Sequence, residues 1–322
     1  WSAYVENDSI PTGGALRQGI REVDMALRFT RRYPEVLELA RTAADIERIQ
    51  KQGRIASLIG LEGGHGIDNQ LSALRAYYEL GVRYMTLTHN TTLSWADAAL
   101  DLPRHNGLTE FGENVVREMN RIGMFVDLSH VAEEVMIDAL RVTEAPVIFS
   151  HSSAKQLLAH PRNVSDRVLR LLPRNGGVIM ITFVPSFLAK GTMEWTARQQ
   201  AEAERLRNDL NDQAEIARRM ADWLKANPAP VATVADVADH IDHVKRVAGV
   251  DNIGIGSDFD GIDFGPVGLE DVSKFPVLFA ELLRRDYTEQ ELQKIAGLNV
   301  LRAMKAMEGT AARLQNTRKP IT

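Results

Sequence analysis

Short apolar runs alternate with longer amphipathic stretches along most of the 322-residue chain, and this alternation limits the fold more than any other feature. The runs are rich in β-branched and aromatic residues and are apolar throughout, as expected for strands that are covered on both faces. Seven runs are predicted to be strands: Trp1–Val5, Ile55–Leu61, Tyr84–Thr88, Met124–Leu128, Val147–Ser150, Val178–Phe183 and Ile253–Gly256. Parallel strands need crossover connections of a dozen or more residues, so the pattern predicts a mainly parallel α/β sheet.

A closed (β/α)₈ barrel of the TIM type needs eight strands, which is one more than the sequence provides. Because the chain begins directly on a strand, we expect the missing first strand to precede Trp1. An open doubly wound sheet is the alternative, but no glycine-rich phosphate-binding motif follows any predicted strand. We therefore expect one barrel domain over residues 1–322.

Several helices can be placed between the strands. Residues 71–81 and 108–123 are amphipathic, and Thr109 is a plausible N-cap for the second of them. Residues 194–227 are rich in Ala, Glu, Arg and Gln and are predicted to form one or two long surface helices inserted between the last two strands. This insertion could be a solvated excursion, a lid or a subunit contact. Residues 305–322 are assigned to a C-terminal tail.

Histidine or carboxylate side chains stand at the ends of five predicted strands. They are Glu62, His89, His130, His151 and Asp258. The C-terminal ends of all barrel strands meet at one face, so these side chains should converge there. The sequence has no cysteine, so a metal site would have to use imidazole and carboxylate ligands. The sequence thus predicts a hydrolytic metal centre at this face.

Two further residues are candidates for the same site. Asp127 lies just before a predicted strand end and could be buried there and orient a histidine. Arg162, in the segment "HPRN", could bind a substrate carboxylate with its fork-shaped guanidinium, although a surface role fits the sequence equally well.

The remaining histidines are not predicted to be ligands. His65 and His160 should lie in loops near the site, and His105 in a solvated loop. His240 and His243 are three residues apart on a predicted helix, a spacing that can mimic a ligand pair, but helix packing is the favoured interpretation.

The bulk composition excludes some classes of partner. A formal net charge of −5 gives no reason to expect nucleic acid or an anionic membrane as a partner. No apolar run reaches the roughly 18 residues that a membrane span requires.

Seven sequence blocks resemble the membrane (renal) dipeptidase family of zinc peptidases: "GLEGGH", "YMTLTHN", "FVDLSHV", "VIFSHSSA", "HPRNV", "GIGSDFDG" and "GLEDVSKFP". The similarity runs from "WSAYV" to about residue 304 and is interrupted mainly by residues 194–227. The resemblance implies a (β/α)₈ barrel that uses two Zn²⁺ ions to hydrolyse dipeptides, including those with a C-terminal D-residue, by a metal-activated hydroxide.

The resemblance also assigns metal ligands. Glu62 would bridge both ions, and His130 and His151 would complete one of them. In the family the other ion is held by a His-x-Asp pair on the first strand, and this chain has no such pair. Either a preceding segment of about 60 residues carries it, or the protein has lost one metal.

Three residues would then act on the substrate. By resemblance, His89 would stabilise the tetrahedral intermediate, Arg162 would bind the substrate carboxylate and Asp258 would transfer the proton. Two alternatives stay open: another metal-dependent amidohydrolase acting on acylated amino acids or lactams, and a non-catalytic barrel that retains the pocket. A homodimer is conceivable. The absence of cysteine suits a bacterial protein of the cytoplasm or periplasm.

Overall fold

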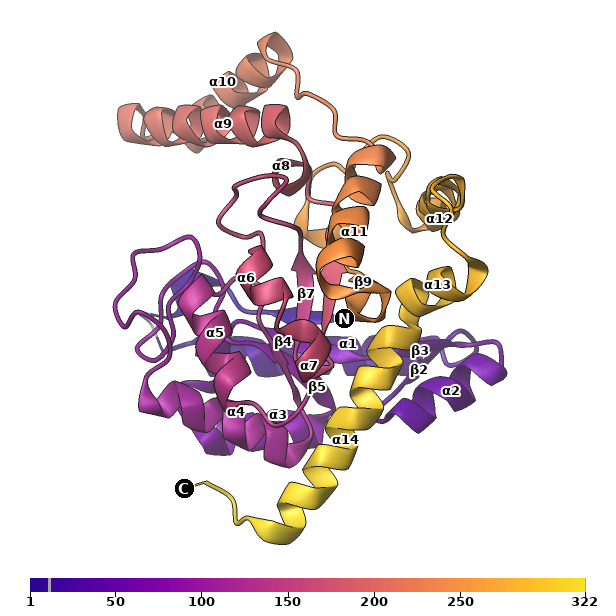
Figure 1. Cartoon of the computed structure of the whole chain (residues 1–322). Coiled ribbons are helices and arrows are strands. Elements are labelled where there is room, and N and C mark those ends of the chain that lie inside the picture. The colour runs from indigo at the N-terminus through magenta and orange to yellow at the C-terminus, as the bar shows by residue number, and fades with distance from the viewer. Residues whose placement is uncertain (11–12, 322) are drawn as a thin grey trace.

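The computed structural model describes residues 1–10 and 13–321 (Figure 1). Its main sheet has seven strands, and every pair of neighbours is parallel. In spatial order they are Ser2–Tyr4 (β1), Ile59–Glu62 (β4), Val82–Thr86 (β5), Phe125–Asp127 (β6), Ile148–Ser152 (β7), Val178–Ile181 (β8) and Ile253–Ile255 (β9). The predicted parallel α/β sheet is confirmed.

The strands of this sheet follow one another in chain order from one edge to the other. A doubly wound sheet instead reverses its strand order at a switch point, so that alternative is wrong. Among residues 1–10 and 13–321, no strand pairs with the outer edge of β1 or of β9. The expectation of a further strand before Trp1 stays untested.

The predicted strand Ile55–Leu61 is in fact two strands in two sheets. Ile55–Ser57 (β3) pairs in parallel with Leu37–Leu39 (β2), a strand that was not predicted. Only the following β4 belongs to the main sheet. Neighbouring main-sheet strands are three to five residues long, so a seven-residue apolar run extends past the sheet and pairs elsewhere.

Fourteen α-helices occur in the described residues. They are Ala15–Arg32 (α1), Ala43–Lys51 (α2), Leu71–Leu80 (α3), Glu110–Ile122 (α4), Glu133–Val142 (α5), Asp166–Leu169 (α6), Leu172–Asn175 (α7), Pro185–Leu188 (α8), Lys190–Asp209 (α9), Gln213–Ala226 (α10), Val234–Ala248 (α11), Phe275–Arg284 (α12), Glu289–Gln293 (α13) and Asn299–Thr317 (α14).

Local sequence signals explain where α4 begins and where α3 ends. The side chain of Thr109 accepts a hydrogen bond from the backbone N–H of Gly112, as predicted for the α4 N-cap. Helix α3 ends at Gly81, whose φ of 113° falls in the left-handed region that glycine adopts without strain.

The segment assigned to a tail, residues 305–322, lies mostly in α14. Met307, Ala311 and Leu314 are buried there, and α14 packs against α4. Figure 1 shows α14 running along the molecule towards the C-terminus.

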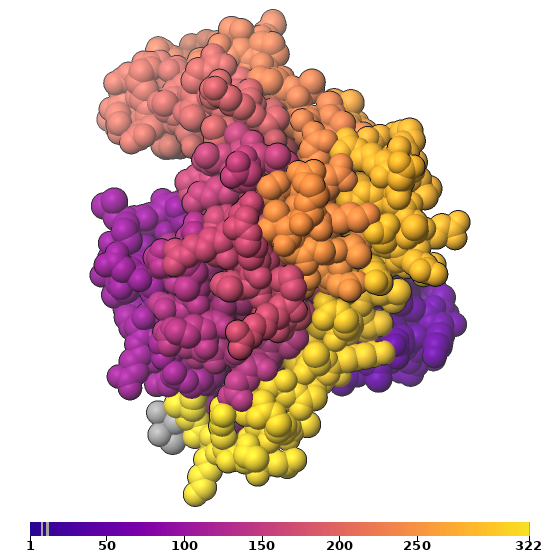
Figure 2. All heavy atoms as spheres, in the orientation of Figure 1, coloured from indigo at the N-terminus to yellow at the C-terminus, as the bar shows by residue number. Residues whose placement is uncertain are grey.

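The insertion forms the two helices α9 and α10, which lie side by side (Figure 1). The two ends of the insertion are joined by Trp195, whose indole N–H donates to the carbonyl of Asn227 at 2.8 Å. The space-filling view shows an open notch between this pair of helices and the purple part of the chain (Figure 2). No helix among the described residues is long and apolar enough to span a membrane.

Candidate metal centre and active site

The five predicted site residues all lie at the C-terminal side of the main sheet. Glu62 and His151 are within the last residues of β4 and β7. His89, His130 and Asp258 each lie three residues beyond the end of β5, β6 and β9, so these strands end earlier than predicted. Because neighbouring strands are parallel, the five positions lie together at the C-terminal ends of the strands.

Glu62, His130 and His151 form one compact group. The Nε2 atoms of the two histidines are 2.8 Å apart, and they lie 3.1 Å (His130) and 3.5 Å (His151) from Oε1 of Glu62. One ligand atom from each residue lies within 4.8 Å of the others, and both histidines are buried. Two imidazole nitrogens and a carboxylate oxygen are the donor set of a three-ligand zinc site with an open fourth position.

The outward nitrogens of the two imidazoles fix which atoms face this group. Nδ1 of His130 lies 2.9 Å from Oδ1 of Asn90, an oxygen that can only accept, so Nδ1 carries the ring proton. Nδ1 of His151 lies 2.8 Å from the hydroxyl of Ser150, which donates its hydrogen to Asp127 and therefore accepts from Nδ1. Burial lowers the pKa of both histidines well below its ordinary value, so both rings are neutral near pH 7.

Three acceptor atoms therefore point at one another with no donor between them. Two lone pairs 2.8 Å apart beside a carboxylate oxygen repel one another unless a cation lies among them. The residues thus fit a bound metal ion, with Glu62, His130 and His151 as its ligands.

The second oxygen of Glu62 has a different partner. Oε2 accepts a hydrogen bond of 2.8 Å from the hydroxyl of Ser2 on β1. Ser2 was not predicted as a site residue. It holds the carboxylate so that only Oε1 faces the two histidines.

His89 lies next to the metal group and is also positioned by β1 and the loop that follows it. Its ring is 4.3 Å from that of His130 and packs edge-on against Tyr4 at 5.0 Å. The side-chain amide of Asn7 donates to Nδ1 at 3.1 Å, so Nε2 of His89 carries the proton. Burial lowers the pKa of His89 to about 4, which keeps the ring neutral and able to donate one hydrogen bond.

Arg162 is almost completely buried, with 2% of its surface exposed. Its Nε and Nη1 atoms have no hydrogen-bond partner, and its guanidinium lies 5.2 Å from the centre of the Phe187 ring. Burial lowers the pKa of Arg162 to about 10, so it stays charged near pH 7, and its charge in turn lowers the pKa of His130 and His151. Of the two roles left open by the sequence, the surface role is wrong.

Asp258 adopts a backbone conformation that is uncommon outside glycine. Its φ is 64°, and that of His130 is 67°, so two site residues have left-handed backbone, which is frequent at functional positions. Burial, with a contribution from the nearby Glu62, raises the pKa of Asp258 to about 7. A carboxyl group with this pKa can both give and take a proton near neutral pH.

Asp127 and the loop histidines occupy the surroundings of the site. Asp127 is fully buried and contacts Ser150, which in turn contacts His151. His65 donates to the carbonyl of Val5 at 3.0 Å, and His160 accepts from the backbone N–H of Arg162 at 3.1 Å.

His105 lies in a largely exposed loop, as predicted, but its own side chain is only partly exposed. Its Nε2 donates to the carbonyl of Leu93 at 3.0 Å. The carboxylate of Asp97 accepts backbone N–H groups from Arg104, His105 and Gly107 and so holds the loop in place.

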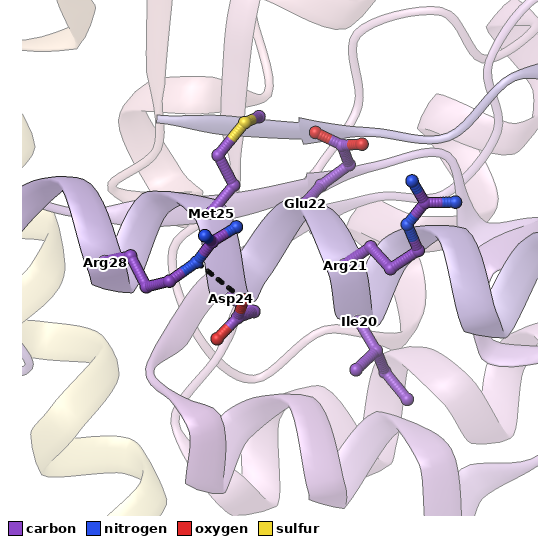
Figure 3. A pocket seen from close by; sticks show the side chains of 6 residues that line it. All are labelled: Ile20, Arg21, Glu22, Asp24, Met25 and Arg28. Carbon is purple, nitrogen blue, oxygen red and sulfur yellow. Dashed lines mark ion pairs between the residues drawn. The ribbon is translucent and has the colours of Figure 1, made fainter.

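A hollow of about 430 Å³ lies on the outer face of α1 (Figure 3). It is lined by exposed side chains of this one helix, including the ion pair of Arg28 and Asp24 at 2.9 Å. It contains none of the predicted site residues.

Known proteins resemble this chain in sequence and in structure. The sequence model of the membrane dipeptidases (peptidase family M19) matches residues 1–318. The dipeptidase tcpJ of Claviceps purpurea (strain 20.1) is 40% identical over 321 residues, which cover 97% of this chain and 67% of that protein.

Two solved structures share the fold at 25% sequence identity. The probable dipeptidase PvdM of Pseudomonas aeruginosa has a TM-score of 0.80 and is matched over 92% of this chain and 80% of its own. A metallo peptidase of Rhodobacter sphaeroides, liganded with a phosphinate mimic of the dipeptide L-Ala-D-Ala, has a TM-score of 0.74, with 90% of this chain and 74% of that chain covered.

These matches decide several expectations at once. The family match reaches residue 318, beyond residue 304, to which the resemblance was expected to extend. The parallel α/β sheet corresponds to the TIM-type barrel of the family. The relatives come from different kinds of organism, so a bacterial origin stays a prediction. With a matching family sequence, a matching fold and a metal-ligand group at the strand ends, this chain is a hydrolase that belongs to the membrane dipeptidase family, peptidase family M19.

Proposed function

We propose that this chain is a zinc-dependent dipeptidase, which accepts dipeptides with a C-terminal D-residue and uses Glu62, His130 and His151 as metal ligands. The observation that carries the proposal is the convergence of three acceptor atoms near a buried guanidinium whose Nε and Nη1 atoms have no partner. The metal group suits hydrolysis of an amide, and the guanidinium suits a free carboxylate, which every dipeptide has. The dipeptide mimic bound by the Rhodobacter sphaeroides relative supports this substrate class and a D-residue at the C-terminal position.

The metal ion, when bound, would polarise the peptide carbonyl and make water nucleophilic near neutral pH. His89 acts on the charge that develops at the carbonyl oxygen. Its protonated Nε2 can donate a hydrogen bond there, and as a neutral donor it does not repel the cation.

Arg162 binds the substrate carboxylate. A buried arginine with unpaired Nε and Nη1 atoms bears a large desolvation cost, which a substrate carboxylate that accepts a hydrogen bond from the guanidinium would offset. The Phe187 ring at 5.2 Å and the bond from its backbone N–H to His160 restrict where this side chain can lie. The substrate is thereby held with its peptide bond towards the metal ligands.

Asp258 transfers the proton. Attack by water requires a base, and the leaving amine requires an acid, and one carboxyl group with a pKa of about 7 can perform both steps in turn.

Hydrolysis of L-Ala-D-Ala and L-Ala-L-Ala by the purified chain tests the proposal. We expect both dipeptides to be cleaved, activity to be lost after chelation, and zinc to restore it. N-terminally free but C-terminally amidated L-Ala-D-Ala is the matched control and should be a poor substrate. A chelated protein that keeps full activity, or equal rates on free and amidated dipeptides, would contradict the proposal.

A further inference from the structure

Asp127 lies beneath the metal group but contributes no ligand atom to it. Its Oδ1 accepts the backbone N–H groups of Ser129 at 3.1 Å and Ser150 at 2.8 Å. Its Oδ2 accepts the hydroxyls of Thr86 and Ser150, both at 2.6 Å. Four donors on two oxygens match the acceptor capacity of an ionised carboxylate, so no donor is left without a partner.

Ser150 connects this carboxylate to a metal ligand. Its hydroxyl oxygen lies 2.6 Å from Oδ2 of Asp127 and 2.8 Å from Nδ1 of His151. A serine hydroxyl has a single hydrogen, and once it is donated to Asp127 the oxygen can only accept from His151. Nδ1 of His151 must then carry the ring proton, and Nε2 presents its lone pair towards Glu62 and His130.

We propose that Asp127 and Ser150 are positioning residues that act in series on His151, fixing the tautomer and the orientation in which it binds the metal. A carboxylate that accepts, directly or through a hydroxyl, from the outer nitrogen of a ligating histidine raises the basicity of the inner nitrogen. His130 has a different arrangement, because its outer nitrogen ends on the neutral amide of Asn90. The two histidine ligands are thus supported unequally, His151 through a hydroxyl that bonds to a carboxylate and His130 through a neutral amide.

Thr86 is the control that distinguishes positioning of His151 from a purely structural role of these hydrogen bonds. It donates to the same Oδ2 of Asp127 from β5, but its hydroxyl makes no contact with a metal ligand. Removing either hydroxyl takes one hydrogen bond from the same buried oxygen. Only the loss of Ser150 would also release the imidazole of His151.

The experiment compares Ser150→Ala, Ser150→Thr and Thr86→Val in the full chain. Zinc affinity is measured by competition with a chromophoric chelator, and the melting temperature of the metal-free protein is measured in parallel. We expect Ser150→Ala to weaken zinc binding by about 10-fold to 100-fold, as loss of a partner of a ligating histidine does. Thr86→Val should lower the melting temperature by about as much as Ser150→Ala does, but it should change zinc affinity less than about 3-fold. Ser150→Thr should have most of the wild-type zinc affinity, because it keeps the hydroxyl.

A second measurement reports on the tautomer directly. Long-range ¹H–¹⁵N spectra of the metal-free protein distinguish an imidazole protonated at Nδ1 from one protonated at Nε2. We expect His151 to be protonated at Nδ1 in the wild type and in Thr86→Val, and to be a mixture of tautomers in Ser150→Ala.

The inference rests on the proposed metal function, and the two can fail separately. If the wild type binds zinc and Ser150→Ala binds it equally well, the positioning role is refuted while the metal function stands. If the wild type binds no zinc, the metal function is refuted and the positioning role with it.

Discussion

Two pairs of histidines, both buried, lie in different surroundings in this protein. In His130 and His151, at the strand ends, one nitrogen of each ring has a partner and the other points at a space shared with Glu62. In His240 and His243, on α11, every ring nitrogen is near a protein group. His240 accepts from the backbone N–H of Ala154 at 3.0 Å and donates to the carbonyl of Leu188 at 3.3 Å.

His243 completes the contrast. Its Nε2 lies 2.7 Å from the carboxylate of Asp166, and its Nδ1 faces Arg246 at 3.4 Å. Nothing further is needed to satisfy this pair. The strand-end pair has two lone pairs that no protein donor satisfies and that a metal ion would, so this metal site is recognised by its unsatisfied acceptors and not by the spacing of its histidines.

The largest expected effect comes from substituting one histidine in each of the two pairs. His151→Ala should abolish zinc binding, from about one ion per chain to less than a tenth, and reduce dipeptidase activity by more than about 10³-fold, because two ligands do not retain the ion. His243→Gln should leave zinc content and kcat within about 2-fold and only lower the melting temperature. Zinc content by elemental analysis and initial rates measure both. Loss of zinc from His243→Gln would remove the distinction between the pairs.

The next effect belongs to the proton transfer. Asp258→Asn removes the acid and base but none of the three ligands, so zinc content should persist while kcat falls by about 10²-fold or more. The amide keeps the shape of the side chain and can remain in its left-handed backbone conformation. Steady-state kinetics with parallel zinc analysis are the measurement. A kcat close to that of the wild type would make Asp258 a structural residue.

A smaller change is expected for the carboxylate site. Arg162→Ala should raise KM for dipeptides by about 30-fold, equivalent to about 2 kcal/mol, because a hydrogen bond to a charged group is lost. An amidated dipeptide, already a poor substrate, should lose little more. The ratio of kcat/KM for the free and amidated substrates, measured in both proteins, isolates the interaction. If Arg162→Ala impairs both substrates equally, the guanidinium does not bind the carboxylate.

The sequence allowed the charged part of the site to be predicted, because polar residues at the ends of apolar runs are conspicuous. Glu62, His151 and the other strand-end residues directly follow hydrophobic stretches, and parallel strands place the ends of these stretches on one side of the sheet. The division of Ile55–Leu61 into two strands was not predicted, since only Ser57 interrupts the apolar run and the change of sheet depends on a partner in β2.

The neutral partners of the site residues could not be found in this way. Ser2, Asn7 and Asn90 are common polar residues, and each becomes functional only through a contact 60, 82 or 40 positions away in the chain. Such contacts follow from the alignment of strands in space and leave no local pattern. Arg162 was ambiguous for a related reason, because burial decides its role and the segment "HPRN" does not indicate burial.

The smallest expected effect is on stability and concerns the metal-free protein. The pKa of Asp258 is raised from 3.8 to about 7, so between these values the folded state binds a proton that the unfolded state has released. The stability of the wild type should therefore fall as the pH rises from about 4 to about 7, and the full cost of the buried charge is present above pH 7. Asp258→Asn has no such charge. At pH 8 the metal-free variant should melt about 3 °C above the metal-free wild type, and at pH 4 the two should melt together.

Zinc provides the internal control for this prediction. A cation bound by Glu62 favours the ionised form of a neighbouring carboxyl, so zinc should lower the pKa of Asp258 and shrink the difference between the two proteins at pH 8. His243→Gln serves as the matched variant from the other histidine pair. Its difference in melting temperature from the wild type should be the same with and without zinc, because all of its partners belong to the protein. Thermal scans at pH 4 and pH 8, with and without zinc, measure all of these differences. If the gap between Asp258→Asn and the wild type did not depend on zinc, the carboxyl of Asp258 would not feel the metal group, and the strand-end residues would not form one electrostatic unit.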